Sequence, residues 1–226
     1  MFKEWPLGQL PETLSRPELT EIRNLGYEWT QPHEVVSLFE DKVAKFTGSK
    51  YAVAVDCCTH AMFLVLKYIN QPQKITIPSH TYISVPMYIK HAGYDVEFID
   101  KEWSGIYQLE PLNVWDSAGR WTENMYTGGF QILSFQIKKR LPIGKGGMIL
   151  CDDYEAYKWF KKVCYDGRDL NVPYNQDDIE LMGWHYYMTP EDAARGIILM
   201  DMTSKINDDS HTHLSYPNLK DFKVFK

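Results

Sequence analysis

Short apolar runs of strand length alternate with stretches of helical periodicity along most of this chain. The run YAVAVD at residues 51–56 is apolar up to its last residue, which is typical of a strand buried on both faces. Just before it, apolar residues recur at three- and four-residue spacing and predict an amphipathic helix over residues 33–46 that ends near Gly48. The apolar face of that helix consists of Val36, Phe39, Val43 and Phe46. Such an alternation favours an α/β fold.

The same pattern continues through the rest of the chain. A helix capped by Thr59, a strand over residues 74–78, a helix over 84–91 and a strand over 95–99 are expected next. Further strands are expected at residues 112–116, 131–135 and 148–151, and Thr189-Pro190-Glu191-Asp192 is typical of the start of a helix that runs to about Met202. We therefore predict one three-layer α/β/α domain over residues 1–206 with a mainly parallel sheet. Its ligand sites should lie outside the carboxyl ends of the strands.

Residues 207–226 form a polar C-terminal tail with few apolar anchors. We expect this tail to drape over a neighbour or to remain mobile, with Phe222, Val224 and Phe225 able to dock. We assign it no chemistry.

The charges of the chain argue against nucleic acid and membrane partners. Asp and Glu number 30 against 24 Lys and Arg, which gives a net charge of -6 with no basic stripe that would suit a phosphate backbone. No apolar run approaches the ~18 residues that cross a bilayer, and charges and a proline interrupt residues 1–10, unlike a secretory signal. We expect a cytoplasmic protein.

The four cysteines are Cys57, Cys58, Cys151 and Cys164, and their spacing is not that of zinc ligands. We expect reduced thiols in the core and no metal site.

Three loops that follow predicted strands contain candidate functional residues. Cys58 and Thr59 begin a helix, where free amides and a hydroxyl can hold a phosphate, although a plain helix cap also accounts for Thr59. Asp116 ends an apolar strand, where a carboxylate needs a cation or a donor, although a turn-forming aspartate is the simpler interpretation. Ser134 and Lys139 lie in a basic loop, where a serine can hold phosphate and a lysine of lowered pKa can condense with an aldehyde. A solvated basic loop is the alternative there.

In this order the three segments resemble those of the DegT/StrS-type sugar aminotransferases, which are pyridoxal-phosphate enzymes of fold type I that act in polysaccharide and nucleotide-sugar metabolism. Segments around them resemble the family as well, and the resemblance extends over roughly residues 26 to 200. These matching segments are residues 39–53, 77–82, 93–100 and 183–188.

The resemblance implies a role for each candidate residue. Lys139 takes the position of the lysine that forms the internal Schiff base with pyridoxal 5′-phosphate, five residues after Ser134, and Lys138 is the neighbour that competes for this role. Asp116 then holds the pyridine nitrogen in its protonated form, and Tyr82 stacks on the ring. The phosphate is held by the remaining three groups, which are Ser134, Thr59 and the amide of Cys58.

His185 lies in a turn that, in the family, reaches the phosphate site of the partner subunit. The resemblance therefore implies a homodimer in which His185 contributes to cofactor binding. Two further departures from the family pattern are Gly119, in place of a polar residue that usually contacts the cofactor, and Tyr187, in place of an arginine.

The region that shapes the sugar pocket departs most from the family. Only residues 101–111 stand where a strand and a helix are usual, and the sequence ends at Lys226, where relatives continue into a C-terminal domain. The leading interpretation is amino transfer from an amino acid such as glutamate to a nucleotide-linked keto sugar. Two alternatives stay open: a non-catalytic or regulatory module that keeps the fold, and a pyridoxal-phosphate-dependent sugar dehydratase, although related dehydratases with histidine at the lysine position differ from Lys139.

Overall fold

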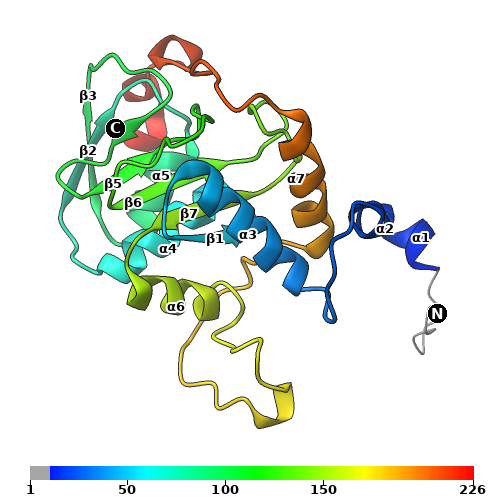
Figure 1. Cartoon of the computed structure of the whole chain (residues 1–226). Coiled ribbons are helices and arrows are strands. Elements are labelled where there is room, and N and C mark those ends of the chain that lie inside the picture. Colours follow the sequence, from blue (N-terminus) through cyan, green and yellow to red (C-terminus); the bar gives the residue numbers. More distant parts are fainter. Residues whose placement is uncertain (1–10) are drawn as a thin grey trace.

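The computed structural model describes residues 11–226, and Figure 1 shows its arrangement of helices around a central sheet. The α-helices are α1 (Glu12–Ser15), α2 (Pro17–Asn24), α3 (Glu34–Thr47), α4 (Cys58–Ile69), α5 (Ser84–His91), α6 (Tyr154–Val163) and α7 (Pro190–Met202). The strands are β1 (Tyr51–Val55), β2 (Lys74–Pro78), β3 (Asp95–Ile99), β4 (Tyr107–Gln108), β5 (Val114–Asp116), β6 (Phe130–Ser134) and β7 (Gly147–Cys151). Short 3-10 turns occupy Tyr174–Gln176, His213–Ser215, Leu219–Asp221 and Lys223–Phe225. The predicted strands thus exist, with ends shifted by up to two residues.

The main sheet has the strand order β1-β7-β6-β5-β4, and a separate parallel pair is formed by β2 and β3. Two backbone hydrogen bonds between Thr76 and Glu110 join β2 to the segment that follows β4. Within the main sheet β5 and β6 are parallel, whereas β7 runs antiparallel to both β1 and β6, and β4 is antiparallel to β5. The sheet is therefore mixed, which corrects the prediction of a mainly parallel sheet. The prediction failed because the alternation of strands and helices did not reveal the direction of β7 or the existence of β4.

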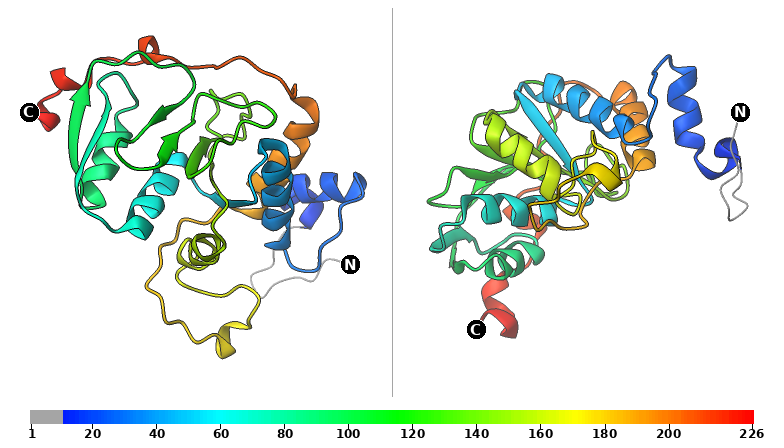
Figure 2. Two further views of the ribbon diagram at one scale, coloured as in Figure 1. Left: turned by 60° about the vertical axis from the view of Figure 1, so that its left-hand side comes forward. Right: turned by 90° about the horizontal axis from the view of Figure 1, so that it is seen from below.

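Each face of the sheet is covered by its own set of helices, as Figures 1 and 2 show. Alternate residues of β1 point to opposite faces, so that Val53 and Val55 join one core while Ala52 and Ala54 join the other. The first core includes apolar residues of α4, α5 and α6, and the second includes those of α2, α3 and α7. These two cores confirm the predicted three-layer α/β/α architecture.

The helix ends follow ordinary capping rules, with one correction to the prediction. Gly48 ends α3 in the left-handed conformation with φ of 84°, and Thr189 caps α7 through a bond from the amide of Asp192. Helix α4 is capped by Cys57, whose sulfur accepts from the amide of His60, and not by Thr59. Thr59 instead lies in the first turn of α4, where its hydroxyl is 2.8 Å from the hydroxyl of Ser84 at the start of α5.

The C-terminal tail packs against its own chain. In Figure 2 it runs from α7 across the molecule toward β2 and β3. Leu219 is fully buried and its amide donates to the carbonyl of Ser79, and the Phe225 ring lies 5.4 Å from that of Phe98. The expectation that the tail drapes over a neighbour or remains mobile was therefore wrong in this respect, while docking by Phe225 is confirmed.

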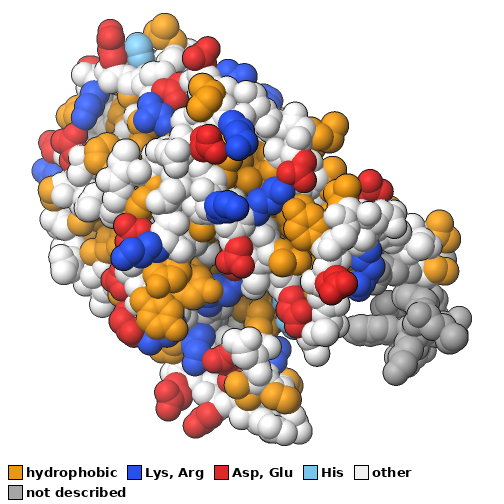
Figure 3. All heavy atoms as spheres, in the orientation of Figure 1, with side chains coloured by type: hydrophobic (Ala, Val, Ile, Leu, Met, Phe, Trp, Pro, Cys, Tyr) orange, Lys and Arg blue, Asp and Glu red, His pale blue; other side chains and the backbone are white. Residues whose placement is uncertain are grey.

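The visible surface in Figure 3 carries interspersed acidic and basic side chains rather than a block of one sign. Among the helices of residues 11–226, none is long and apolar enough to cross a membrane. The prediction about a secretory signal concerns residues 1–10, which lie outside the described residues.

Candidate active site

A cavity of about 550 Å³ opens at the carboxyl ends of β1, β5 and β6. The starts of α4 and α5, the loop between β6 and β7, and the C-terminal tail all contribute to its walls. Six of the seven predicted site residues line this one cavity: Cys58, Thr59, Tyr82, Asp116, Ser134 and Lys139. The fold therefore brings together residues that the sequence places up to 81 positions apart, from Cys58 to Lys139.

The start of helix α4 forms one end of the cavity. Cys58 and Thr59 lie in its first turn, where backbone amides have no partner within the helix and carry the positive end of its dipole. Gly147 of β7 passes directly beneath, and a Cβ there would lie 2.4 Å from the Cys58 backbone nitrogen. Only glycine permits this close approach, which fixes the helix start against the sheet.

Asp116 forms the buried acid of the cavity. Its Oδ2 accepts a 2.6 Å hydrogen bond from the hydroxyl of Tyr107, and its Oδ1 accepts from the amide of Ala118 at 2.9 Å. Burial raises the pKa of Asp116, while those two donors and the charge of Lys139 act in the opposite direction. No lysine, arginine or histidine of the described residues lies within ion-pair distance of this carboxylate. Asp116 is therefore a buried acid without a cationic partner.

Lys139 differs from Lys138 in its surroundings. Both side chains line the cavity, but Lys138 is exposed and Lys139 is half-buried. Burial lowers the pKa of Lys139, and the opposing charges of Asp116 and Cys58 only partly restore it. A lowered pKa makes an amine a better nucleophile near neutral pH, which favours Lys139 over Lys138 for covalent chemistry.

Aromatic rings line the side of the cavity near α5. The Tyr82 ring is 57% exposed at its mouth and lies 6.3 Å from the ring of Tyr216. Trp103 also lines this wall, stacked 6.0 Å from Tyr216. Tyr82 thus remains available to a planar ligand.

His185 is the predicted site residue that does not join the cavity of its own chain. It lies in the segment between α6 and α7, mostly exposed, with its Nδ1 2.8 Å from the carboxylate of Asp166. Its ring packs edge-on against that of Tyr187 at 4.7 Å.

Prediction from the sequence missed several cavity residues. Tyr107 lies in β4, whose two residues are too short for a periodic signal, and Ser210, His211 and Tyr216 belong to the tail to which no chemistry was assigned. The available signal was the HTH stretch at residues 211–213, since histidine is a frequent acid, base and ligand-binding residue.

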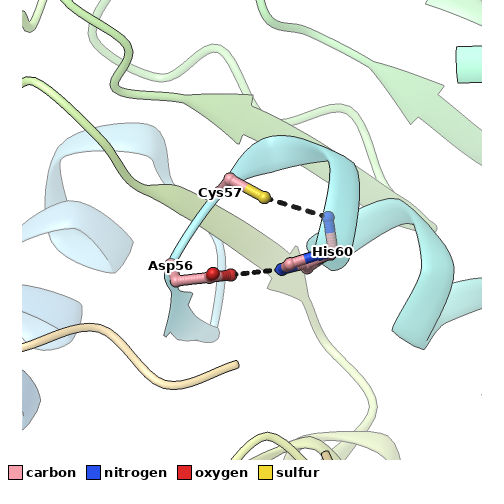
Figure 4. Close-up of side chains that lie close together, drawn as sticks. All are labelled: Asp56, Cys57 and His60. Carbon is pink, nitrogen blue, oxygen red and sulfur yellow. Dashed lines mark hydrogen bonds and ion pairs between the residues drawn. The ribbon is translucent and has the colours of Figure 1, made fainter. Parts of the chain in front are cut away.

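The prediction also missed a polar cluster beside the cavity, formed by Asp56, Cys57 and His60 (Figure 4). The His60 Nδ1 lies 2.6 Å from Asp56 Oδ1, and Lys145 donates to Asp56 Oδ2 at 3.0 Å. Burial alone would lower the pKa of His60, but Asp56 and Cys57 outweigh it and raise the pKa to about 9. His60 is therefore protonated at neutral pH in this arrangement, and the cluster is a network of charges.

The cysteines divide between the core and the cavity. All four are unpaired thiols, which agrees with the expectation of reduced cysteines. Cys151 and Cys164 are buried, and burial raises the pKa of each to about 12. Cys57 and Cys58 are partly buried and line the cavity, although Cys58 also packs against the core, which corrects the expectation for this pair.

A buried acid, a half-buried lysine and the start of a helix line one cavity of this α/β domain. Residues 15–114 and 121–218 match the DegT/DnrJ/EryC1/StrS aminotransferase family, and the chain belongs to this family.

The spore coat polysaccharide biosynthesis protein SpsC of Bacillus subtilis (strain 168) is 36% identical over 85 residues, which are 37% of this chain and 21% of that protein. Among solved structures, the PLP form of the putative sugar aminotransferase Spr1654 from Streptococcus pneumoniae superimposes with a TM-score of 0.65 at 17% identity, over 86% of this chain and 65% of that one. DesI in the presence of its TDP-sugar product gives a TM-score of 0.62 at 17% identity, over 85% and 59%. These likenesses establish the fold as that of fold-type-I aminotransferases, and the chain spans only part of the length of these relatives.

The family uses pyridoxal phosphate, and the cavity fits this group. The uncompensated carboxylate of Asp116 suits a protonated ring nitrogen, since a buried acid needs a cation or a donor. The first turn of α4 offers amides for a phosphate. The amine of Lys139 lines the same space as both.

Proposed function

We propose that this chain binds pyridoxal 5′-phosphate and works as a sugar aminotransferase, with a nucleotide-linked keto sugar as acceptor and an amino acid such as glutamate as donor. The observation that supports this most is that Asp116 and Lys139 share one cavity, where burial raises the pKa of the acid and lowers that of the amine. Family membership supports the reaction, and the TDP-sugar product in the DesI structure supports the substrate class.

Each cavity residue has a definite task in this proposal. When bound, pyridoxal phosphate supplies an aldehyde for condensation with amines and a protonated ring that takes up electrons from a bond broken at the substrate carbon. Asp116 keeps the ring nitrogen protonated, Tyr82 covers the ring face, and Ser134 with the first turn of α4 orients the phosphate.

Lys139 has two tasks. Its amine holds the cofactor before the substrate arrives, and after displacement the same amine moves a proton at the substrate carbon. Condensation and proton uptake both need the unprotonated amine, and the lowered pKa of Lys139 increases the fraction in that form. Lys138, which is exposed, offers a matched comparison.

The experiment is to add pyridoxal phosphate to the purified wild type and to the Lys139→Ala and Lys138→Ala variants. A yellow colour that borohydride bleaches is expected in the wild type and in Lys138→Ala but not in Lys139→Ala. Equal colour in all three proteins would remove Lys139 from this role. Conversion of the bound cofactor to its amine form by glutamate then tests the donor.

A homodimer is part of the proposal, because the segment that contains His185 also presents apolar side chains to solvent. Ile179, Leu181 and Met182 are 43%, 36% and 93% exposed, and such side chains are typical of surfaces that another subunit covers. Light scattering of the wild type and of Met182→Lys tests this: a dimer that dissociates in the variant supports the proposal, and a monomeric wild type contradicts it. The unpaired thiols favour a reducing compartment such as the cytoplasm.

A non-catalytic or regulatory module that keeps the fold is the second candidate. A coloured protein whose cofactor never converts to the amine form with any amino-acid donor would support this candidate over the enzyme. The dehydratase alternative predicts instead that the sugar loses a hydroxyl group without gaining nitrogen.

A further inference from the structure

The tail supplies one whole side of the cavity. Within residues 208–216, which we call the C-terminal segment, Ser210, His211, Ser215 and Tyr216 all line the cavity. They face the wall formed by Asp116 and Lys139 at the carboxyl ends of the strands. Several contacts hold the C-terminal segment in this position.

Two glycines make room for the C-terminal segment. A Cβ at Gly105, which has φ of +67°, would lie 2.1 Å from the carboxylate carbon of Asp209. A Cβ at Gly119 would lie 3.1 Å from the Cβ of His211 and 3.0 Å from the Cα of Gly105. A side chain at Gly105 is therefore excluded while the segment lies where it does, and one at Gly119 would press tightly on it.

Polar contacts anchor the segment on the same two glycines. The amide of Ser210 donates to the carbonyl of Gly119 at 2.8 Å, and the amide of Gly105 donates to the carbonyl of His211 at 2.8 Å. Beside them, Arg120 binds both oxygens of Asp209, at 2.9 and 2.8 Å. A paired fork of this kind is specific in geometry, so the segment has a defined register over the cavity.

The hydrogen bonds of Ser210 assign the protonation of His211. The Ser210 hydroxyl lies 3.1 Å from the Gly119 carbonyl, which can only accept, and 2.8 Å from Nδ1 of His211. Both contacts are satisfied when the single hydroxyl proton goes to Gly119 and the imidazole donates from Nδ1. The other ring nitrogen, Nε2, is then unprotonated and is an acceptor.

The surroundings of His211 keep the ring neutral. Burial lowers the pKa of His211, and the positive charges of Lys139 and Lys138 lower it further. No protein donor to Nε2 is found among residues 11–226. Next to it the Tyr216 ring is nearly parallel to the His211 ring at 6.1 Å, which gives the acceptor a flat apolar neighbour.

We propose that His211 is a ligand-binding residue of the cavity, whose Nε2 accepts a hydrogen bond from a hydroxyl group of the bound ligand, and that Gly105 and Gly119 exist to admit the segment that carries it. This rests on the proposed function, which supplies a sugar whose hydroxyl groups can donate. The ring 3-oxygen of pyridoxal phosphate is ionised when the ring nitrogen is protonated and can only accept, so it does not suit an unprotonated Nε2. Tyr216 adds a ring against which the sugar can pack.

The test compares His211→Ala with the wild type and with Leu214→Ala, a control in the same segment whose side chain is 83% exposed and does not line the cavity. Absorbance titration gives the Kd for pyridoxal phosphate, and calorimetry on the cofactor-loaded proteins gives the Kd for TDP-glucose. Loss of one hydrogen bond at His211 should raise the Kd for TDP-glucose about tenfold and leave the Kd for pyridoxal phosphate unchanged. A rise in the Kd for pyridoxal phosphate alone would overturn the assignment to a sugar hydroxyl.

Two further variants guard against a general loss of structure. His211→Gln restores an acceptor near the position of Nε2 and should recover part of the lost affinity. In Gly119→Ala the added Cβ presses on the Cβ of His211, and this variant should weaken binding of the same ligand.

The outcomes separate this inference from the proposed function. A wild type that stays colourless with pyridoxal phosphate, or a Lys139→Ala variant as coloured as the wild type, contradicts the proposed function. A wild type with lysine-dependent colour, together with a His211→Ala variant whose constants match those of Leu214→Ala, overturns the role of His211 alone. A cofactor-loaded wild type that does not bind TDP-glucose also overturns this role of His211.

Discussion

Asp56 and Asp116 each follow or end a strand, β1 and β5, whose carboxyl ends lie at the same edge of the sheet, yet their surroundings are opposite. Asp56 lies between two cations, His60 and Lys145, and these outweigh burial and lower its pKa. Asp116 has a phenol and an amide as partners, and burial raises its pKa. An acid with its cations already in place stabilises the fold, whereas an acid without one is prepared for a ligand that brings a positive charge.

The largest expected effect comes from removing the charge of Asp116. Asp116→Asn leaves nothing to keep a ring nitrogen protonated, and the rate of cofactor conversion by an amino-acid donor should fall about 100-fold or more. Stopped-flow absorbance measures this rate. Asp56→Asn is the matched control and should retain a rate within a factor of about two. Similar losses in both variants would erase the distinction between the two acids.

The next largest effect is on the stability of the folded state and tests the pairing of Asp56 with His60. Because the pKa of His60 is raised to about 9, its pairing with Asp56 stabilises the folded state fully below the ordinary histidine value of about 6.5 and is lost as pH rises toward 9. His60→Gln should therefore lower the free energy of unfolding by about 1 to 2 kcal/mol near neutral or mildly acidic pH. Denaturant unfolding should show the gap closing above about pH 9. A gap that does not vary with pH would argue against a charged pair.

A smaller effect is expected from the phenol that supports Asp116. Tyr107→Phe removes the 2.6 Å hydrogen bond to Oδ2, which raises the pKa of the acid further and weakens its hold on a cationic ring. The Kd for pyridoxal phosphate should rise about fivefold, as for one lost hydrogen bond. Tyr88→Phe, which removes a hydroxyl 3.2 Å from Nε2 of His60, should leave this Kd unchanged. An effect of Tyr88→Phe as large as that of Tyr107→Phe would show that the two clusters are not independent.

The smallest effect belongs to Lys145. Its side chain is 66% exposed, so its ion pair with Asp56 is screened by water, and Lys145→Ala should change the free energy of unfolding by less than about 0.5 kcal/mol. A loss of similar size to that of His60→Gln would mean that Lys145, and not His60, is the main partner of Asp56. Thermal unfolding of Lys145→Ala and of His60→Gln in low and high salt measures the two losses of stability.

The elements with a clear period or cap were predictable from the sequence. Strands β2 and β3 and helix α5 occur at the predicted residues, and Thr189 caps α7 as expected, because each depends on local patterns. The cavity was predictable only as an ordered set of motifs, which placed Asp116 and Lys139 in one site. Three other features depend on contacts between distant segments. These are the antiparallel direction of β7, the short β4 with Tyr107, and the packing of the tail on Gly105 and Gly119. No local pattern encodes such contacts.

The position of the C-terminal segment has a consequence for synthesis of the protein. A chain emerges from the ribosome starting at its N-terminus, and domains fold in that direction. The acid, the lysine and the helix start are all made before residue 140, but the wall with His211 and Tyr216 follows more than 60 residues later. Strand β7, which lies between β1 and β6, is also made after residue 140, so the sheet is completed before the last wall of the cavity is synthesised. The C-terminal segment is therefore the last part of the cavity to become available for folding.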